Sequence, residues 1–101
     1  MPAYIIVEAA ISDGEKFGAY AQAVPALVAE YGGDYLVLGG EQHALEGDWS
    51  GKRIVIHQWP SIEQAKAFWH SNAYAEIKQL RDGTGEFRVA LVDGLARETL
   101  E

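Results

Sequence analysis

Three histidines are the side chains of this 101-residue sequence that normally titrate near neutral pH, so they are the first candidates for general acids or bases. His43 lies just past the glycine pair at 39–40, where a bend in a strand would re-aim side chains, and it is our preferred base. His57 shares a strand face with Trp59, and two interpretations stay open: a hydrogen-bonded histidine in a dimer interface, or a base in a cavity. His70 is expected to face solvent from a helix.

Two arginines and one glutamate are candidates for binding the polar groups of a substrate. Arg53 and Arg81 could each hold a carboxylate or enolate oxygen by a bidentate contact. Ordinary ion pairs with the 15 acidic residues of the chain explain these arginines about as well. Glu46 could orient the region around His43, although accepting hydrogen bonds from backbone N–H groups in a hairpin is its favoured use.

Aromatic side chains suggest where a small, largely apolar ligand would lie. The candidates for cavity walls are Tyr20, Tyr35, Trp49, Trp69 and Tyr74. Core or interface packing is the favoured alternative, because large rings supply much of the burial in a small domain.

On a strand His43 and Glu46 would point to opposite faces, so no metal pair is expected. The sequence also contains no phosphate-binding loop or nucleophile motif, and we predict no cofactor.

Composition limits the classes of partner. Fifteen acidic residues against eight basic ones give a formal net charge of -7, which disfavours binding to nucleic acid and to anionic membranes. The chain has no cysteine, and its N-terminal segment lacks the basic and apolar regions of a secretion signal, so we expect a cytoplasmic protein. The length predicts a single domain over residues 1–101.

The pattern of apolar and capping residues predicts four strands and two helical regions. Apolar runs rich in β-branched residues predict strands at 3–11, 34–40, 53–59 and 87–95. Capping boxes at 12–15 and 61–64 open the two helical regions, and a new cap at Ser71 predicts a further turn or two ending near Gly83. Residues 96–101 are interpreted as a tail. The order β-α-β-β-α-β is that of an α+β, ferredoxin-like fold with a four-stranded antiparallel sheet and both helices on one face.

The glycine pair at 39–40 is interpreted as a bulge within one long strand that continues through 41–47. Residues 48–51 then form the turn into the next strand. Strand segments such as YLVL and RIVIHQW are apolar at consecutive positions, so the sheet face away from the helices also carries Val37, Val55, Trp59 or their neighbours. No remaining segment can cover that face. A second copy is therefore predicted to pack against it, giving a dimeric α+β barrel.

Ordered motifs over nearly the whole chain resemble a known family. They are Tyr20 and Pro25, YGGDYLVLGG at 31–40, LEGDW at 45–49, WPS at 59–61, Ala65, SNAY at 71–74, Arg81 and LVDG at 91–94. Together they are similar to the family called domain of unknown function 1330. The resemblance implies the dimeric α+β barrel superfamily, which includes cofactor-free monooxygenases, muconolactone-type isomerases and chlorite-dismutase-like haem proteins. It implies no particular reaction, and the chain departs from the pattern at Gln58, where an acidic residue is typical.

These observations lead to two functional hypotheses. The first is a homodimer that binds a small organic molecule under its sheet and performs cofactor-free proton-transfer or oxygenation chemistry. In it, His43 is the base, Arg81 or Arg53 is the oxyanion partner, and Tyr20 and Trp49 are walls. The second is a non-catalytic binding or assembly module.

Overall fold

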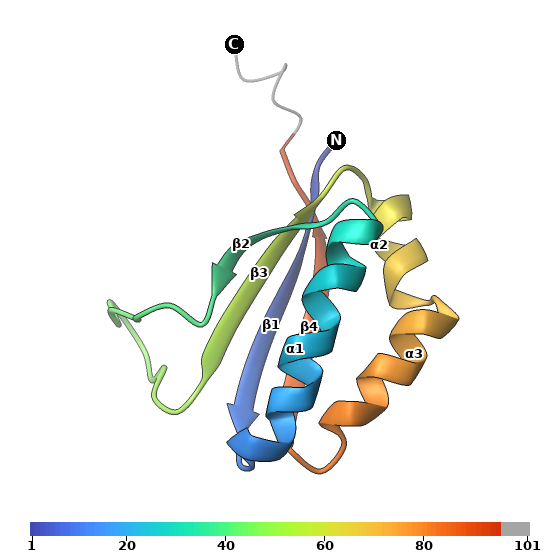
Figure 1. Ribbon diagram of the computed structural model, residues 1–101. Coiled ribbons are helices and arrows are strands. Elements are labelled where there is room, and N and C mark those ends of the chain that lie inside the picture. The colour runs from blue at the N-terminus through green and yellow to red at the C-terminus, as the bar shows by residue number, and fades with distance from the viewer. Residues whose placement is uncertain (96–101) are drawn as a thin grey trace.

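The computed structural model describes residues 1–95, which form one sheet with helices on one face (Figure 1). The elements are β1 (Ala3–Ile11), α1 (Gly14–Glu30), β2 (Asp34–Leu38), β3 (Arg53–Trp59), α2 (Ile62–Trp69), α3 (Asn72–Lys78), the 3-10 helix η1 (Gln79–Arg81) and β4 (Gly85–Asp93). The strand order is β2-β3-β1-β4, and every neighbouring pair is antiparallel. This is the predicted ferredoxin-like α+β fold. The predicted tail at 96–101 lies outside the described residues.

Serine caps divide the second helical region as the sequence predicts. The Ser61 hydroxyl accepts a hydrogen bond from the Gln64 N–H at the start of α2, and the Ser71 hydroxyl accepts one from the Tyr74 N–H at the start of α3. The local sequence therefore determines the break between α2 and α3.

The cap of α1 differs from the prediction. Asp13, not Ser12, is the N-cap, and its carboxylate accepts a hydrogen bond from the Lys16 N–H. Ser12 instead donates its hydroxyl and its backbone N–H to the Thr84 carbonyl, in the turn before β4. That partner is distant in sequence, which is why a local capping pattern could not identify it.

The core lies between the sheet and the helices. Its largest fully buried side chains are Trp59, Tyr74, Phe68 and Val28. A methyl group added at Gly33 would lie 2.7 Å from Trp59, so the chain between α1 and β2 needs glycine to pass over this ring.

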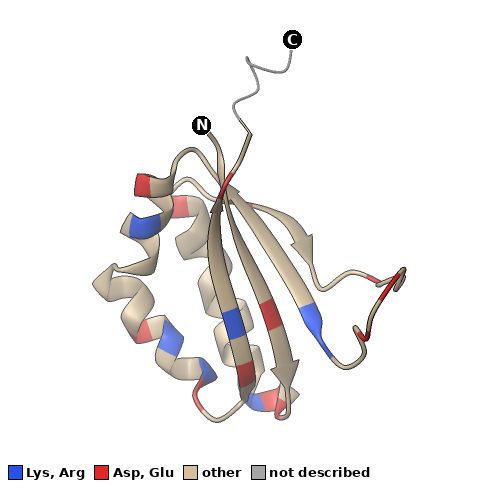
Figure 2. Cartoon of the chain, turned by 180° about the vertical axis from the view of Figure 1, so that it is seen from behind, with Lys and Arg blue, Asp and Glu red and all other residues tan. Residues whose placement is uncertain are grey.

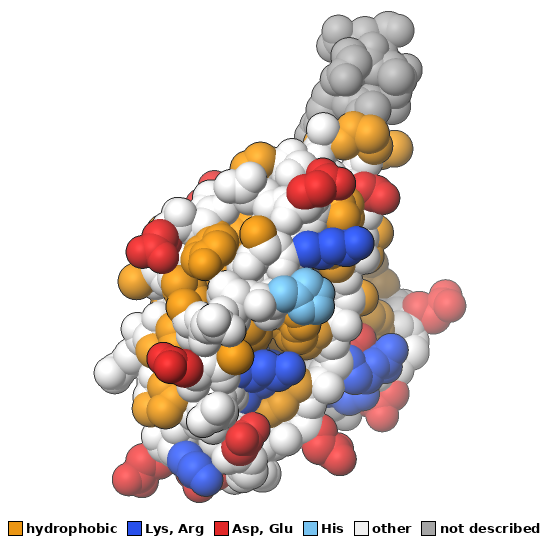
Figure 3. Space-filling model, turned by 90° about the vertical axis from the view of Figure 1, so that its right-hand side faces the viewer, with side chains coloured by type: hydrophobic (Ala, Val, Ile, Leu, Met, Phe, Trp, Pro, Cys, Tyr) orange, Lys and Arg blue, Asp and Glu red, His pale blue; other side chains and the backbone are white. Residues whose placement is uncertain are grey.

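No helix within residues 1–95 is long and apolar enough to cross a membrane. The side of the molecule that bears α2 and α3 presents hydrophobic, polar and charged side chains in mixture (Figure 3).

The predicted continuation of the second strand is wrong. β2 ends at Leu38, and the register shift in its pairing with β3 falls between Tyr35 and Val37 rather than at the glycine pair. Gly39 has a φ of +67°, which takes the chain out of the extended conformation. Residues 39–52 form an exposed connection that reaches away from the edge of the sheet (Figure 1).

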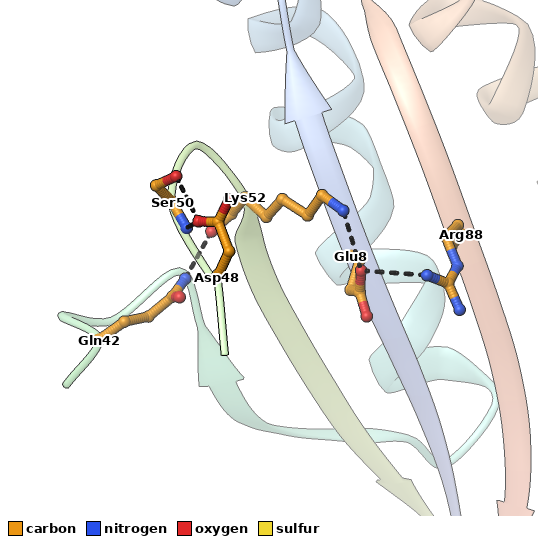
Figure 4. A network of polar contacts seen from close by, with 6 residues as sticks. All are labelled: Glu8, Gln42, Asp48, Ser50, Lys52 and Arg88. Atoms are coloured by element: carbon orange, nitrogen blue, oxygen red, sulfur yellow. Dashed lines mark hydrogen bonds and ion pairs between the residues drawn. The ribbon is translucent and has the colours of Figure 1, made fainter. Parts of the chain in front are cut away.

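Local polar contacts shape this connection and tie it to the sheet (Figure 4). The Asp48 carboxylate accepts hydrogen bonds from the N–H and the hydroxyl of Ser50, which supports the predicted turn. Beside it, Glu8 of β1 lies 3.8 Å from Lys52 and 3.7 Å from Arg88. Exposed pairs of this kind contribute about 0–1 kcal/mol each, so they position the strands more than they stabilise them.

The outer face of the sheet, away from the helices, is apolar, and of the three residues predicted there Val37 lies on this side, beside Ile56. Val55 and Trp59 point to the helix side, because they pair in register with Val7 and Ala3 of β1, and Trp59 is fully buried there. Their alternating neighbours Ile54 and Ile56 point outward. Uncharged residues make up most of the strands on this face (Figure 2).

Candidate functional site

A cavity of about 110 Å³ lies between the sheet and the helices. Most of the residues singled out from the sequence line it: Tyr20, Tyr35, Arg53, His57, Trp69, Tyr74 and Arg81. They come from α1, β2, β3, α2, α3 and η1, so only the folded chain brings them together. The remaining lining is mainly aliphatic and aromatic, which is typical of a site for a small organic molecule.

His57 faces this cavity and is held in one tautomer. Its side chain is 6% exposed, and its Nδ1 accepts a hydrogen bond of 2.8 Å from the Trp59 Nε1–H. Indole nitrogen only donates, so Nδ1 must carry the lone pair and Nε2 the hydrogen. Burial lowers the pKa of the imidazole to about 4, which keeps it neutral at pH 7. His57 therefore offers a hydrogen-bond donor to the cavity and has no free lone pair with which to act as a base.

Arg81 supplies a positive charge to the same cavity. It is 9% exposed and ends η1, where its carbonyl accepts hydrogen bonds from the N–H and hydroxyl of the buried Thr84. Its guanidinium carbon lies 4.4 Å from the ring centre of Phe87 and 5.6 Å from that of Tyr20. Among residues 1–95, no carboxylate forms an ion pair with this guanidinium. A nearly buried cation thus has aromatic neighbours but no counter-charge.

Three tyrosines complete the polar lining. The hydroxyl groups of Tyr20 and Tyr74 lie 2.8 Å apart and share a hydrogen bond. Burial, with a smaller contribution from Tyr20, raises the pKa of Tyr74 above its ordinary value and that of Tyr35 to about 12. Tyr35 and Tyr74 therefore remain protonated under ordinary conditions.

The polar groups of the cavity can all donate hydrogen bonds. They are N–H and O–H groups, and no Asp or Glu lies among the described residues that line it. Every fully buried side-chain nitrogen or oxygen within residues 1–95 has a hydrogen-bond partner. The Nε2 of His57 and the guanidinium of Arg81, which have none there, must therefore open onto accessible space. Such an arrangement can stabilise negative charge on a bound oxygen, but it holds no group that would accept a proton at neutral pH.

Arg53 lies at the opening of the cavity. It lines the cavity although its side chain is exposed. A methyl group added at Gly39 would lie 2.6 Å from the Arg53 Nε, so the end of β2 packs directly against this side chain. Gly39, the first residue of the glycine pair, thus leaves room for the Arg53 side chain, a structural role that differs from the predicted bulge.

His43, Glu46 and Trp49 are not part of this cavity. They line a groove of about 460 Å³ on the outer side of the sheet, together with Ile54 and Ile56. The Trp49 Nε1–H donates to the Glu46 backbone carbonyl, which is a different contact from the predicted one between Glu46 and backbone N–H groups. The structure therefore separates the preferred base from the predicted oxyanion partners.

Sequence reasoning missed the roles of two residues that do not line the cavity but contact side chains that do. Trp59 sets the tautomer of His57, and Phe87 packs its ring on Arg81. The alternation of strand residues offered a signal for Trp59, which shares a face with His57. No local pattern links Phe87 to Arg81. Within residues 1–95, no three His, Asp or Glu side chains come together as a metal site would require.

Comparisons with solved structures support the fold. A protein of unknown function from Rhodopseudomonas palustris, RPA0582, superimposes with a TM-score of 0.76 and 16% identity, over 93% of this chain and 82% of that one. SnoaB, a cofactor-independent oxygenase from Streptomyces nogalater, gives 0.63 and 9% over 93% of both chains. A protein from Nitrosomonas europaea provisionally described as an antibiotic biosynthesis monooxygenase gives 0.59 and 14%, over 94% and 91%. No curated protein matches the sequence.

The neighbours share the α+β barrel fold of antibiotic biosynthesis monooxygenases, and at these identities the likeness concerns the fold alone. The family model called Domain of unknown function (DUF1330) matches residues 2–95, which is nearly the whole chain. This protein therefore belongs to the DUF1330 family.

Proposed function

We propose that this protein is a homodimer that binds a small organic molecule in the cavity between its sheet and its helices. The observation that carries the proposal is that His57 and Arg81, both nearly buried, present N–H groups to the cavity without a partner among residues 1–95. Both groups open onto the accessible space of the cavity, where a hydrogen bond to a ligand would contribute about 0.5–1.5 kcal/mol, and one to a charged group about 1.5–3 kcal/mol. A bound molecule with acceptor oxygens would supply the missing partners.

The fold and the cavity support cofactor-free chemistry as one form of this function. Oxygenation and isomerisation of carbonyl compounds both pass through a carbanion whose charge resides largely on oxygen, and donors held in place stabilise that charge. His43, the base predicted from the sequence, lines the outer groove instead of this cavity, so it serves such a reaction only if the substrate binds in the groove. Turnover should then be abolished by His43→Ala while the dimer persists, and undiminished turnover would remove His43 from this role.

A non-catalytic binding module is the second form, and the absence of a base from the cavity lining favours it. The lone pair of His57 accepts the hydrogen bond from Trp59, and Tyr35 and Tyr74 are protonated at neutral pH. In this form substitutions at His43 change neither ligand affinity nor ligand identity.

The outer face of the sheet is our reason for proposing a dimer. Ile54 and Ile56 are only half-buried, and in the connection beside them Leu45 is 97% and Trp49 45% exposed. An apolar surface of this kind is costly to leave in water. The barrel-type neighbours support a second copy as the cover.

Native mass spectrometry of gently purified protein tests both parts of the proposal. A dimer carrying a reproducible additional mass that is lost on denaturation would support it, whereas a monomer without such a mass would refute it. The variant Ile56→Lys places a charge on the outer face and should yield monomers. Glu63→Lys, on the exposed side of α2, is the matched control and should stay dimeric. A dimeric Ile56→Lys protein would show that the copies associate elsewhere.

A further inference from the structure

The cavity has a charge character opposite to that of the whole protein. The sequence carries a net charge of -7, yet the described lining of this cavity contains two arginines and no carboxylate. One of them, Arg81, is nearly buried between two aromatic rings. Burying an unpaired charge is unfavourable, so this arrangement is expected where a ligand supplies the opposite charge.

The other donors point to the same kind of ligand. The imidazole of His57 presents Nε2–H, because Trp59 holds the opposite nitrogen. Guanidinium and N–H groups placed around one space fit an acceptor with two oxygens, which accepts from both without offering a hydrogen in return. A neutral amide fits less well, because its NH₂ group would meet donors.

Volume limits the size of this ligand. The cavity encloses about 110 Å³, whereas a cavity of about 150 Å³ holds one benzene ring. The enclosed part of a ligand is therefore about six non-hydrogen atoms or fewer. Fused aromatic ring systems exceed this space.

We propose that the cavity is a receptor for a small aliphatic carboxylate, with Arg81 as the counter-charge and His57 as a fixed neutral donor to the same carboxylate. This inference deepens the proposed function and rests on it. Arg53, exposed at the opening, would attract the anion before it enters.

Butyrate and butyramide are suitable probes, since they have the same shape and differ in charge. Binding to the full-length protein would be measured by calorimetry and by the shift in Tm. Charge-assisted hydrogen bonds are stronger than neutral ones. Butyramide should therefore bind at least about tenfold more weakly than butyrate. Butyrate should also shift the ¹H and ¹⁵N resonances of His57 Nε2–H, a change that a purely structural role for His57 would not produce.

Two variants test whether Arg81 supplies the charge that favours the acid over the amide. Arg81→Gln should remove the preference for the acid, and Arg81→Lys should keep part of it, because the charge remains while the planar fork is lost. The control is Arg88→Gln, since the Arg88 side chain is exposed, pairs with Glu8 and does not line the cavity. It should bind butyrate as the unaltered protein does.

The outcomes separate this inference from the proposed function. Equal affinity for acid and amide, or full butyrate affinity in Arg81→Gln, would overturn the carboxylate assignment and leave a binding cavity. Failure of butyrate, acetate and pyruvate to bind would overturn it as well, and the native mass measurement would then decide the proposed function independently. If Arg81→Gln does not fold, the comparison of acid with amide in the unaltered protein still decides.

Discussion

His57 should make the stability of this fold depend on pH between about 4 and 6.5, with the protein less stable at the acidic end. Burial lowers the pKa of this imidazole from 6.5 to about 4, and protonation of Nδ1 would also break its hydrogen bond with Trp59. Between these values the unfolded chain binds a proton that the folded chain excludes. The free energy of unfolding therefore falls as the pH drops from 6.5 to 4 and is fully restored above this range.

The expected magnitude follows from the two pKa values. A difference of about 2.5 pH units, at about 1.4 kcal/mol for each, gives a loss of about 3 kcal/mol at the acidic end. The surroundings agree with this direction, because Tyr35, Tyr74 and Arg81 line the same cavity as His57 and no carboxylate lines it within residues 1–95. A loss of this size is a large part of the about 5–15 kcal/mol that stabilises a typical domain.

Urea denaturation at several pH values from 4 to 7 would measure this effect. Acidic conditions act on other groups as well, so the relevant quantity is the difference between the unaltered protein and His57→Gln. This variant keeps an acceptor for Trp59 but does not titrate. His70→Gln is the matched control, because His70 lies exposed at the end of α2.

We expect His57→Gln to lose less stability on acidification than the other two proteins, by about 3 kcal/mol. The same pH dependence in all three would refute the reasoning, since it would mean that His57 exchanges its proton equally in the folded and unfolded states.

Two further substitutions test the residues that hold the site. Trp59→Phe leaves the buried Nδ1 of His57 without its donor and should cost about 1–3 kcal/mol beyond the packing loss; ¹⁵N NMR should then show a mixture of His57 tautomers, and a single unchanged Nε2–H tautomer would contradict the assignment. Gly39→Ala must accept a φ of +67° and a contact of 2.6 Å with Arg53, so its urea midpoint should fall by the equivalent of about 1–2 kcal/mol. Gly40→Ala, which would meet no atom within 4 Å, is its control, and equal midpoints for the two variants would exclude the strained contact.

Local signals in the sequence predicted most elements of the fold. Ala3–Ile11 and Arg53–Trp59 have the predicted bounds, because runs of β-branched residues favour strands wherever they lie. Ser61 and Ser71 cap the helices predicted from them, since a cap involves residues only three apart. The end of β2 was missed because an edge strand stops where its pairing stops, and pairing is set by the neighbouring strand.

The sequence likewise predicted only part of the chemistry of the candidate site. The residue types, with histidines, arginines and tyrosines among apolar strands, determined that a polar site under a sheet was possible. Tertiary structure decided that His43 lies on the outer side of the sheet, because residues 39–52 leave the sheet instead of extending it. It also decided that His57 is a donor, because a tautomer depends on the partner of the opposite nitrogen. The sequence by itself determines which groups are available, and their burial and contacts in three dimensions decide what charge and which hydrogen each one carries.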